Sequence, residues 1–213
     1  MEIITVVSGP VATNCYVLID DVSSKAVVID APLDCTEQIF SRLNDDSIKI
    51  EKILLTHSHW DHTAGASDLR KISNADIYIH PDDDYRLKDQ NKHSVFPLGF
   101  NIEPINNAVL LSNYEKIPVG DIELEVRHTP GHTEGSVCFI DYKNKVVFSG
   151  DTLFFRSIGR ADLPGGDYKA ILNSIRNELM TLSDDFKVFT GHGAITDIGF
   201  ERRNNPFLID NMM

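Results

Sequence analysis

The segment Leu54-Leu55-Thr56-His57-Ser58-His59-Trp60-Asp61-His62 places three histidines and an aspartate directly after an apolar run. The apolar run predicts the end of a buried strand. The helical spacing of Thr63 to Ile72 predicts a helix behind it, so the polar cluster lies on a strand-to-helix turn. Residues two apart in an extended segment project to the same side, which places His57 and His59 to bind one ion. Asp61 and His62 turn away with the chain and are placed to serve a second ion beside the first.

Two interpretations of this cluster differ in how many of its side chains they explain. A polar loop could use one histidine to cap the next helix, but this leaves the other potential ligands without a role. Histidine and carboxylate are the usual protein ligands of zinc and iron. Four of them between residues 57 and 62 therefore predict a metal site.

Length, composition and charge narrow the class of protein. The chain has 213 residues, of which 42% are hydrophobic, and these values suit one α/β domain over residues 1–213. The formal net charge is 20 minus 32, or −12, which argues against general binding to nucleic acid or anionic lipid because both need a basic surface. The N-terminus has no basic region followed by an apolar run. We therefore expect a cytoplasmic protein with no membrane span and no nucleic-acid partner.

The three cysteines, Cys15, Cys35 and Cys138, are widely spaced and form no CxxC pair. This pattern does not indicate a disulfide framework. Cys15 and Cys138 lie in apolar runs, where packing in the core is a better explanation than catalysis.

Strands and helices alternate in the first half of the chain, as in an α/β fold. An antiparallel meander is expected from three short β-branched runs, Ile3–Val7, Cys15–Ile19 and Ala26–Ile29. Asp30 ends the third run, where its carboxylate could cap the next turn or brace the metal-binding loop, and the two roles are compatible. A helix is expected over residues 36–44 and a strand over Ile48–Leu55.

Beyond the opening motif, Asp76–Ile79 predicts another strand, and Pro81 begins a helix with acids in its first turn. We expect this acidic run, Asp82-Asp83-Asp84, to be a solvated first turn. Periodicity fails from Lys88 to Asn107, and such a long irregular connection often lies near a site. His80 and His93 have no ligand-like companions at useful spacing, and we expect both to be ordinary polar residues.

The second half returns to strands and adds three more candidate ligands. Strands are expected at Ile122–Val126, Ser136–Tyr142, Lys145–Phe148 and Val188–Thr190, with a Lys143-Asn144 turn and a helix that starts at Asp167. His132, Asp151 and His192 each follow a predicted strand and each lie beside a glycine. We therefore expect them to converge on one edge of a sheet pair, and with the first cluster they make seven ligands, too many for one ion.

In this order, the residues His57-x-His59-x-Asp61-His62, His132, Asp151 and His192 resemble the five-part ligand pattern of the metallo-β-lactamase superfamily over nearly the whole chain. The resemblance implies a four-layer αββα sandwich with two metal ions in a groove at one sheet edge. It implies that His57, His59 and His132 hold the first ion, that Asp61, His62 and His192 hold the second, and that Asp151 bridges them. Asp30 matches the early structural aspartate of the superfamily.

Within the superfamily, Gly131-His132-Thr133, Gly150-Asp151-Thr152-Leu153-Phe154 and Gly191-His192-Gly193 resemble the glyoxalase II-like hydrolases. The segment Ser157–Asp167 resembles the short, single-domain subgroup and also the related persulfide dioxygenases. The sequence ends at Met213, without the C-terminal helical region of full-length glyoxalase II. Arg156 and Arg160 are candidates to hold an anionic substrate, although an arginine in a polar loop as often only stabilises the conformation of the loop.

A metal pair indicates hydrolysis by a metal-bound hydroxide, because a bound ion lowers the pKa of water from about 15.7 to about 7. Asp61 is the candidate catalytic residue that orients this hydroxide. A thiol leaving group with a pKa of about 8.5 needs no strong general acid, which favours a thioester such as S-lactoylglutathione, or an activated ester, over an amide. The two divalent ions are expected to be zinc, with iron or manganese as alternatives.

Two other functions stay open from the sequence. His57, His132 and Asp151 could form the 2-His-1-carboxylate site of an iron persulfide dioxygenase. A non-catalytic metal-binding or partner-binding domain is the third reading, which does not explain why all seven ligands are present. The oligomeric state, the native metal and the exact substrate are not indicated by the sequence.

Overall fold

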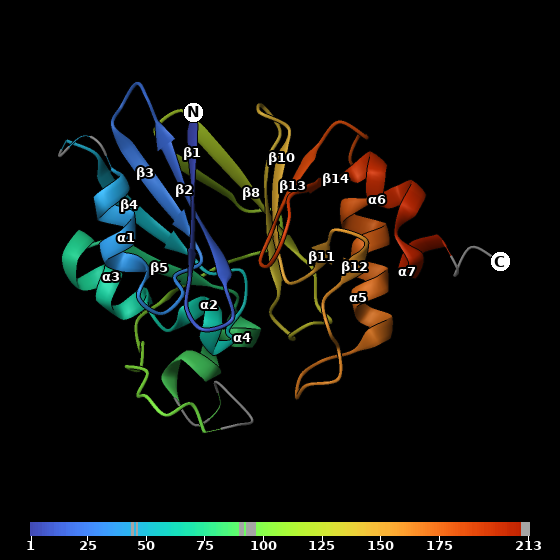
Figure 1. Cartoon of the computed structure of the whole chain (residues 1–213), viewed down its shortest axis with the longest axis horizontal. Helices are drawn as coiled ribbons and strands as arrows, with labels where there is room; N and C mark the ends of the chain where they lie inside the picture. The colour runs from blue at the N-terminus through green and yellow to red at the C-terminus, as the bar shows by residue number, and fades with distance from the viewer. Residues whose placement is uncertain (44, 46, 90–91, 93–96, 210–213) are drawn as a thin grey trace.

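A computed structural model describes residues 1–43, 45, 47–89, 92 and 97–209 of the chain. His93 lies outside these residues. The fold is a four-layer αββα sandwich, in which two sheets stand face to face at the centre and helices cover both outer faces (Figure 1). This is the architecture that the sequence predicted.

The N-terminal sheet has six strands in the order β1 (Glu2–Ser8), β2 (Thr13–Asp20), β3 (Lys25–Ile29), β4 (Lys49–Leu54), β5 (Asp76–Ile79) and β6 (Val109–Leu110). The first three strands pair antiparallel, which confirms the predicted meander. From β3 onward the pairs are parallel. The outer face is covered by α1 (Cys35–Arg42), α3 (Ala66–Ser73) and α4 (Pro81–Lys88).

The C-terminal sheet also has six strands, in the order β14 (Thr196–Asp197), β13 (Lys187–Thr190), β10 (Val146–Gly150), β9 (Val137–Asp141), β8 (Ile122–His128) and β7 (Lys116–Val119). A small hairpin, β11 (Leu153–Phe154) and β12 (Ser157–Ile158), follows β10. Its helices are α5 (Tyr168–Ser174), which continues as a wider π turn, η2 (Ile175–Leu179), and then α6 (Ile198–Asn204) and α7 (Pro206–Ile209). The side chain of Asp167 caps α5, as predicted.

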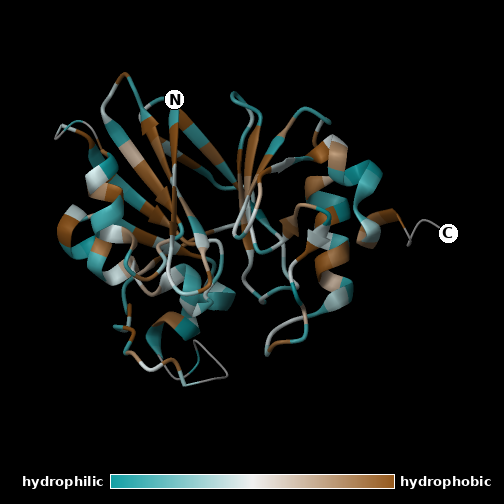
Figure 2. Cartoon of the chain, in the orientation of Figure 1, coloured by the Kyte–Doolittle hydropathy of each residue, from teal (hydrophilic) through white to brown (hydrophobic). Residues whose placement is uncertain are grey.

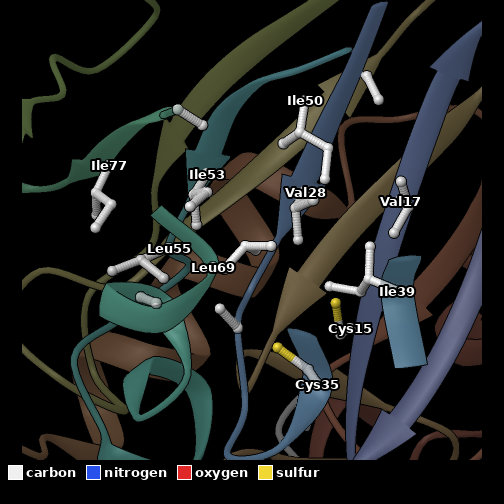
Figure 3. Close-up of a cluster of buried hydrophobic side chains, with 14 of the residues drawn as sticks. Cys15, Val17, Val28, Cys35, Ile39, Ile50, Ile53, Leu55, Leu69 and Ile77 are labelled. Carbon is white, nitrogen blue, oxygen red and sulfur yellow. The ribbon is translucent and has the colours of Figure 1, made fainter. Parts of the chain in front are cut away.

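Period-two alternation divides the apolar side chains among three cores. In β2, Cys15 and Val17 point toward α1 while Tyr16 and Leu18 point into the space between the sheets. Strands buried on both faces carry almost continuous apolar runs, which appear as brown strands at the centre of Figure 2. Figure 3 shows the core under α1 and α3, where Cys15 and Cys35 lie among the apolar side chains. Cys138 lies in the third core, so the cysteines are buried as expected.

The predicted helix over Thr63 to Ile72 is wrong in its extent. The chain instead forms one turn, α2 (Trp60–Thr63), and restarts as α3 after Gly65. Gly65 donates its N–H to the Ala31 carbonyl, and a Cβ at this position would clash with the Pro32 carbonyl and come within 3.1 Å of the Cys35 Sγ. This close contact with the β3–α1 connection bends the chain, and Asp61 and His62 therefore lie on a separate helical turn.

The expected solvated acidic turn at the start of α4 is also wrong for two of its three residues. Pro81 begins α4 and His80 is its N-cap, as expected for a helix start. The side chain of Asp82 is exposed, but Asp83 is 0% exposed and Asp84 is 8% exposed. Buried carboxylates need charged or hydrogen-bonding partners, and these partners come from parts of the chain that are distant in sequence.

The irregular connection after α4 lies near the metal-ligand candidates, as predicted. Residues 97–108 form neither helix nor strand, and the ring of Phe100 contacts the ring of Trp60 with a centroid distance of 5.8 Å. In the part of the chain that is described, no helix is long and apolar enough to cross a membrane.

Candidate metal centre

The seven predicted ligands come together at the ends of four strands. His57, His59, Asp61 and His62 follow β4, His132 follows β8, Asp151 follows β10 and His192 follows β13. Because β3, β4 and the pair β10–β13 run parallel, their carboxyl ends meet at one edge of the sandwich. The predicted convergence on a sheet edge is what the structure shows.

The first group consists of His57, His59 and His132. One ring nitrogen from each lies within 4.8 Å of the other two, and His59 Nδ1 is 2.8 Å from His132 Nε2. The three rings meet edge to face, with centroids 4.5–4.8 Å apart. This is a trio of nitrogen donors aimed at one point.

The second group consists of Asp61, His62 and His192. His192 Nε2 lies 3.1 Å from Asp61 Oδ2 and 3.2 Å from His62 Nε2. Thr13 donates a hydrogen bond of 3.3 Å to the same carboxylate oxygen of Asp61. The group therefore offers two imidazole nitrogens and one carboxylate.

Asp151 lies between the two groups. Its Oδ1 is 3.2 Å from His62 Nε2, and its Oδ2 is 3.5 Å from His132 Nε2 and 3.6 Å from His192 Nε2. One carboxylate thus faces nitrogen donors of both groups, which is the position that the sequence predicted for a bridging ligand.

Hydrogen bonds to Nδ1 orient three of the histidine rings so that their Nε2 atoms face the centre. His62 Nδ1 is 2.7 Å from Asp30 Oδ2, His132 Nδ1 is 2.7 Å from the Arg160 carbonyl, and His57 Nδ1 is 3.1 Å from Thr56 Oγ1. A carboxylate or carbonyl accepts only, so His62 and His132 carry a proton on Nδ1 and turn Nε2 toward the centre. Such outer partners orient the ligands of metal sites.

Asp30 also receives a hydrogen bond of 2.8 Å from the Thr56 backbone N–H. Asp30 therefore connects the end of β3 to Thr56, just before the ligand segment, and to His62, at the end of that segment. These contacts favour the bracing role over helix capping, since α1 begins only at Cys35.

Two buried polar atoms indicate that the centre fits a cation. Among the described residues, His57 Nε2 has no hydrogen-bond partner, and Asp151 Oδ1 has only the 3.2 Å ionic contact with His62 Nε2, which lacks good hydrogen-bond geometry; a buried polar atom without a partner is costly. Burial and the neighbouring histidines lower the pKa of His57 well below its ordinary value and lower that of His59 to about 3. Both imidazoles are therefore neutral, as metal ligands must be.

In the second group, nearby carboxylates determine the direction in which the pKa values of the histidines are shifted. Burial alone would lower the pKa of His62, but Asp151, Asp30 and Asp61 outweigh it and raise this pKa well above the ordinary value. The pKa of His192 is raised in the same way, with Asp61 and Asp151 overcoming burial. A cation is thus favoured at this position, and a proton competes with a metal ion for it.

Glycine and asparagine bring the His192 loop close to the other ligands. A Cβ on Gly191 would lie 2.8 Å from His62 Cε1 and would clash with Asp151 Oδ1. The buried side chain of Asn14 donates to the carbonyls of Thr190 at 2.9 Å and Gly193 at 3.1 Å. Asn14 was not predicted from the sequence, although a polar residue at the start of an otherwise apolar strand could have indicated it.

A further group of potential ligands, His80, Asp82 and His128, lies apart from this centre. The rings of His80 and His128 are stacked at 4.0 Å with an interplanar angle of 12°. Because lone pairs lie in the ring plane, one ion could not be in plane with both stacked rings. His80 instead accepts a hydrogen bond from the Asp82 N–H, in keeping with an ordinary polar role.

A cavity of about 870 Å³ opens onto the ligands, a size that suits a small-molecule substrate. Its wall includes apolar and aromatic residues together with Arg86 and Arg160, and His59, Asp61, His132, Asp151 and His192 lie at its base. The side chain of Arg160 is 58% exposed and forms paired hydrogen bonds with Asp162. Arg156 is exposed and is not among the wall residues, so the geometry favours Arg160 of the two candidates for substrate binding.

The model of the Metallo-beta-lactamase superfamily matches residues 8–192. The chain belongs to this superfamily. It is 35% identical to the hydroxyacylglutathione hydrolase GloC of Haemophilus influenzae over 200 residues, which cover 92% of each chain. The family assignment confirms the resemblance that the ligand order indicated.

Two solved structures resemble the chain over almost its full length. The BLEG-1 B3 metallo-beta-lactamase is 37% identical with a TM-score of 0.87, and the match covers 97% of this chain and 99% of that one. TTHA1623 in a di-iron-bound form is 34% identical with a TM-score of 0.84, and the match covers 96% of this chain and 100% of that one. Similar folds therefore carry different activities, so the substrate must be argued from the site of this chain.

Proposed function

We propose that this protein is a dinuclear metal-dependent hydrolase that cleaves a small thioester, with S-lactoylglutathione as the representative substrate. The observation that carries the proposal is the arrangement of seven ligand candidates as two groups around Asp151. His57, His59 and His132 would hold one ion, Asp61, His62 and His192 the other, and Asp151 both. The similarity to GloC supports the choice of a thioester.

Zinc is the proposed metal, with iron or manganese as alternatives, because imidazole and carboxylate donors accept all three. When bound, two divalent ions supply a water with a pKa lowered to about 7 and polarise a carbonyl group. The similarity to a di-iron structure shows that a related site accepts iron. Elemental analysis of the purified protein distinguishes zinc from iron and manganese.

The residues of the chain supply the remaining functions. Asp61 lines the cavity, and its Oδ2 accepts a hydrogen bond from Thr13, so it is placed to orient an attacking water. The apolar part of the cavity wall excludes bulk water around an acyl group. Arg160 lies at the wall with its guanidinium half open to solvent, where paired N–H donors suit a substrate carboxylate.

The ligand motifs themselves contain no evident proton donor for a poor leaving group, and the other side chains of the cavity wall that carry a titratable proton include Tyr85 and Lys92. A thiolate leaves without protonation because the pKa of a thiol is about 8.5. This favours a thioester or activated ester over an amide. The proposed partner is thus a small molecule.

An iron persulfide dioxygenase is the second candidate. It would use His57, His132 and Asp151, which lie in the same cluster. His62 separates the two functions, since the hydrolase needs it for the second ion and the iron triad does not use it.

The test compares the wild type with His62→Ala by metal content, thioester hydrolysis and oxygen uptake. We expect wild-type hydrolysis with about two ions per chain, and a loss of about 10²-fold or more in His62→Ala with one ion retained. His80→Asn is the matched control, because His80 is a buried histidine outside both groups and asparagine keeps its N-cap.

Near wild-type hydrolysis by a His62→Ala protein with one ion would reject the two-metal mechanism. Oxygen uptake that depends on a persulfide, in iron-loaded wild type that hydrolyses no thioester, would replace the hydrolase with the dioxygenase.

A further inference from the structure

Asp83 is the buried carboxylate in the first turn of α4. Its side chain is completely inaccessible and accepts four hydrogen bonds. Three of these come from the segments that carry the first group of ligands, although Asp83 itself touches none of the seven. Burying a charge is costly, so a carboxylate that is buried and held by four specific partners is expected to have a structural role.

The partners of Asp83 belong to two different ligand segments. On the β4 side, the Ser58 backbone N–H donates to Oδ2 at 2.7 Å, and Ser58 is the residue between His57 and His59. On the β8 side, Thr133 Oγ1 donates to Oδ2 at 2.8 Å and the Gly135 N–H donates to Oδ1 at 2.9 Å, directly after His132. One carboxylate therefore connects the two segments that supply the first group.

Arg86, one turn further along α4, completes the connection. Its Nη1 donates to Asp83 Oδ1 at 3.1 Å and to Ser58 Oγ at 3.3 Å, and the pair neutralises the buried charge. Its Nη2 donates to Glu134 Oε2 at 2.7 Å and to the Pro164 carbonyl at 3.0 Å. Arg86 thus joins the same two segments to the cavity wall.

The second group is held by other contacts. His62 is bonded to Asp30, its carbonyl accepts the Ala31 N–H at 2.8 Å, and the His192 loop is held by Asn14. Within the described part of the chain, the hydrogen bonds of Asp83 go to Ser58, Arg86, Thr133 and Gly135 and not to Asp61, His62 or His192. Asp83 therefore braces the first group alone, whereas Asp30 contacts His62 and, through Thr56, the His57 side as well.

We propose that Asp83 is a positioning residue that sets the separation between the His57–His59 segment and His132 and so determines the affinity of the first metal group. The inference rests on the proposed function for its metal ligands. Under this proposal, a residue of α4 that is distant in sequence from every ligand segment helps to set the geometry of the metal centre.

Asp83→Asn tests this with almost no change in shape. Each carboxylate oxygen of Asp83 accepts one backbone N–H, from Ser58 at Oδ2 and from Gly135 at Oδ1. Whichever way the amide of asparagine is turned, its NH₂ group faces one of these donors. One of the two segments therefore loses its bond and is pushed away.

Gly135→Ala disturbs the same contact from the other side. A Cβ on Gly135 would lie 2.7 Å from both the Cβ and the backbone nitrogen of Asp83. The matched control is Asp84→Asn, because Asp84 is a nearly buried neighbour in the same helical turn whose ion pair is with Lys88.

Zinc affinity is measured by competition with a chromophoric chelator in two backgrounds. In His192→Ala the retained ion reports the first group, and in His59→Ala it reports the second. We expect Asp83→Asn and Gly135→Ala to weaken zinc binding about 10-fold or more in the first background and to leave it nearly unchanged in the second. Thermal melting of the metal-free proteins reports any general loss of stability.

Equal weakening in both backgrounds, equal weakening by Asp84→Asn, or unchanged affinity in the His192→Ala background would overturn the positioning role of Asp83. Failure of both parent backgrounds to bind zinc would overturn the proposed metal centre itself together with this inference. The two failures are thus distinguishable.

Discussion

Asp30→Asn is the perturbation that best tests how the second metal group is held. Asp30 is 2% exposed and connects His62 Nδ1, at 2.7 Å, to the Thr56 backbone N–H, at 2.8 Å. Asparagine keeps the shape but removes the charge, and its NH₂ group faces either the Thr56 N–H or His62 Nδ1. Even with its oxygen toward His62, the remaining bond is no longer charge-assisted. The proposed ion on His62 Nε2 then loses the support of a negative charge behind the ring.

The expected loss of zinc affinity follows from the bond between Asp30 and His62. Hydrogen bonds to charged groups contribute about 1.5–3 kcal/mol, and at about 1.36 kcal/mol per decade this is roughly 10- to 150-fold in affinity. A competing effect reduces it, because Asp30 also raises the pKa of His62 and so favours a competing proton. A divalent ion gains more than a proton from the same carboxylate, so the affinity falls, and we expect a loss of about 10-fold near neutral pH.

The assay is zinc competition with a chelator, and the control is Asp141→Asn. Asp141 is 1% exposed and accepts two hydrogen bonds from Asn144, in the turn after β9 and outside the metal centre. The control should lower the melting temperature without changing zinc affinity. Wild-type affinity in Asp30→Asn, or an equal loss in Asp141→Asn, would refute the bracing role.

The pH dependence of the metal-free protein tests the same contact. Since the pKa of His62 is raised in the folded state, its protonated form contributes stability that is fully present below the ordinary value, about 6.5, and is lost as pH rises through the raised pKa. Asp30→Asn removes part of this contribution. The difference in melting temperature between metal-free wild type and Asp30→Asn should therefore be larger at pH 6 than at pH 9, and an unchanged difference would contradict the assignment.

Three further outcomes are expected. Elemental analysis should give about two ions per chain, and a well-loaded preparation that never exceeds one would contradict the shared Asp151. Arg160→Ala should weaken the use of anionic substrates more than that of neutral esters, whereas equal losses would remove Arg160 from the binding site. Burial raises the pKa of Cys138 to about 11 and that of Cys15 well above its ordinary value, so a chromogenic disulfide reagent should react with neither thiol until the protein is unfolded.

Much of the metal centre was predictable because local sequence controls it. His57 and His59 are two residues apart at the end of a strand, and His132, Asp151 and His192 each follow a strand, so strand polarity alone brings them to one edge. Most strands were equally predictable, because residues buried on both faces of a sheet must be apolar in sequence. The two-residue strands β6, β11, β12 and β14 were missed because a pair of residues carries no periodicity, and the edge strand β7, which contains Pro118, was missed as well.

Only the tertiary structure decided which polar residues hold the ligands in place. Asp83 and Asp82 are indistinguishable in a run of three acids, yet one is buried and the other exposed because only Asp83 faces Ser58 and Gly135. Arg156 and Arg160 are likewise separated only by the course of the chain around the cavity. Local sequence determines the conformation of each segment, whereas a hydrogen bond between segments 25 or 52 residues apart depends on how the sheets and helices pack, and no periodicity records that packing.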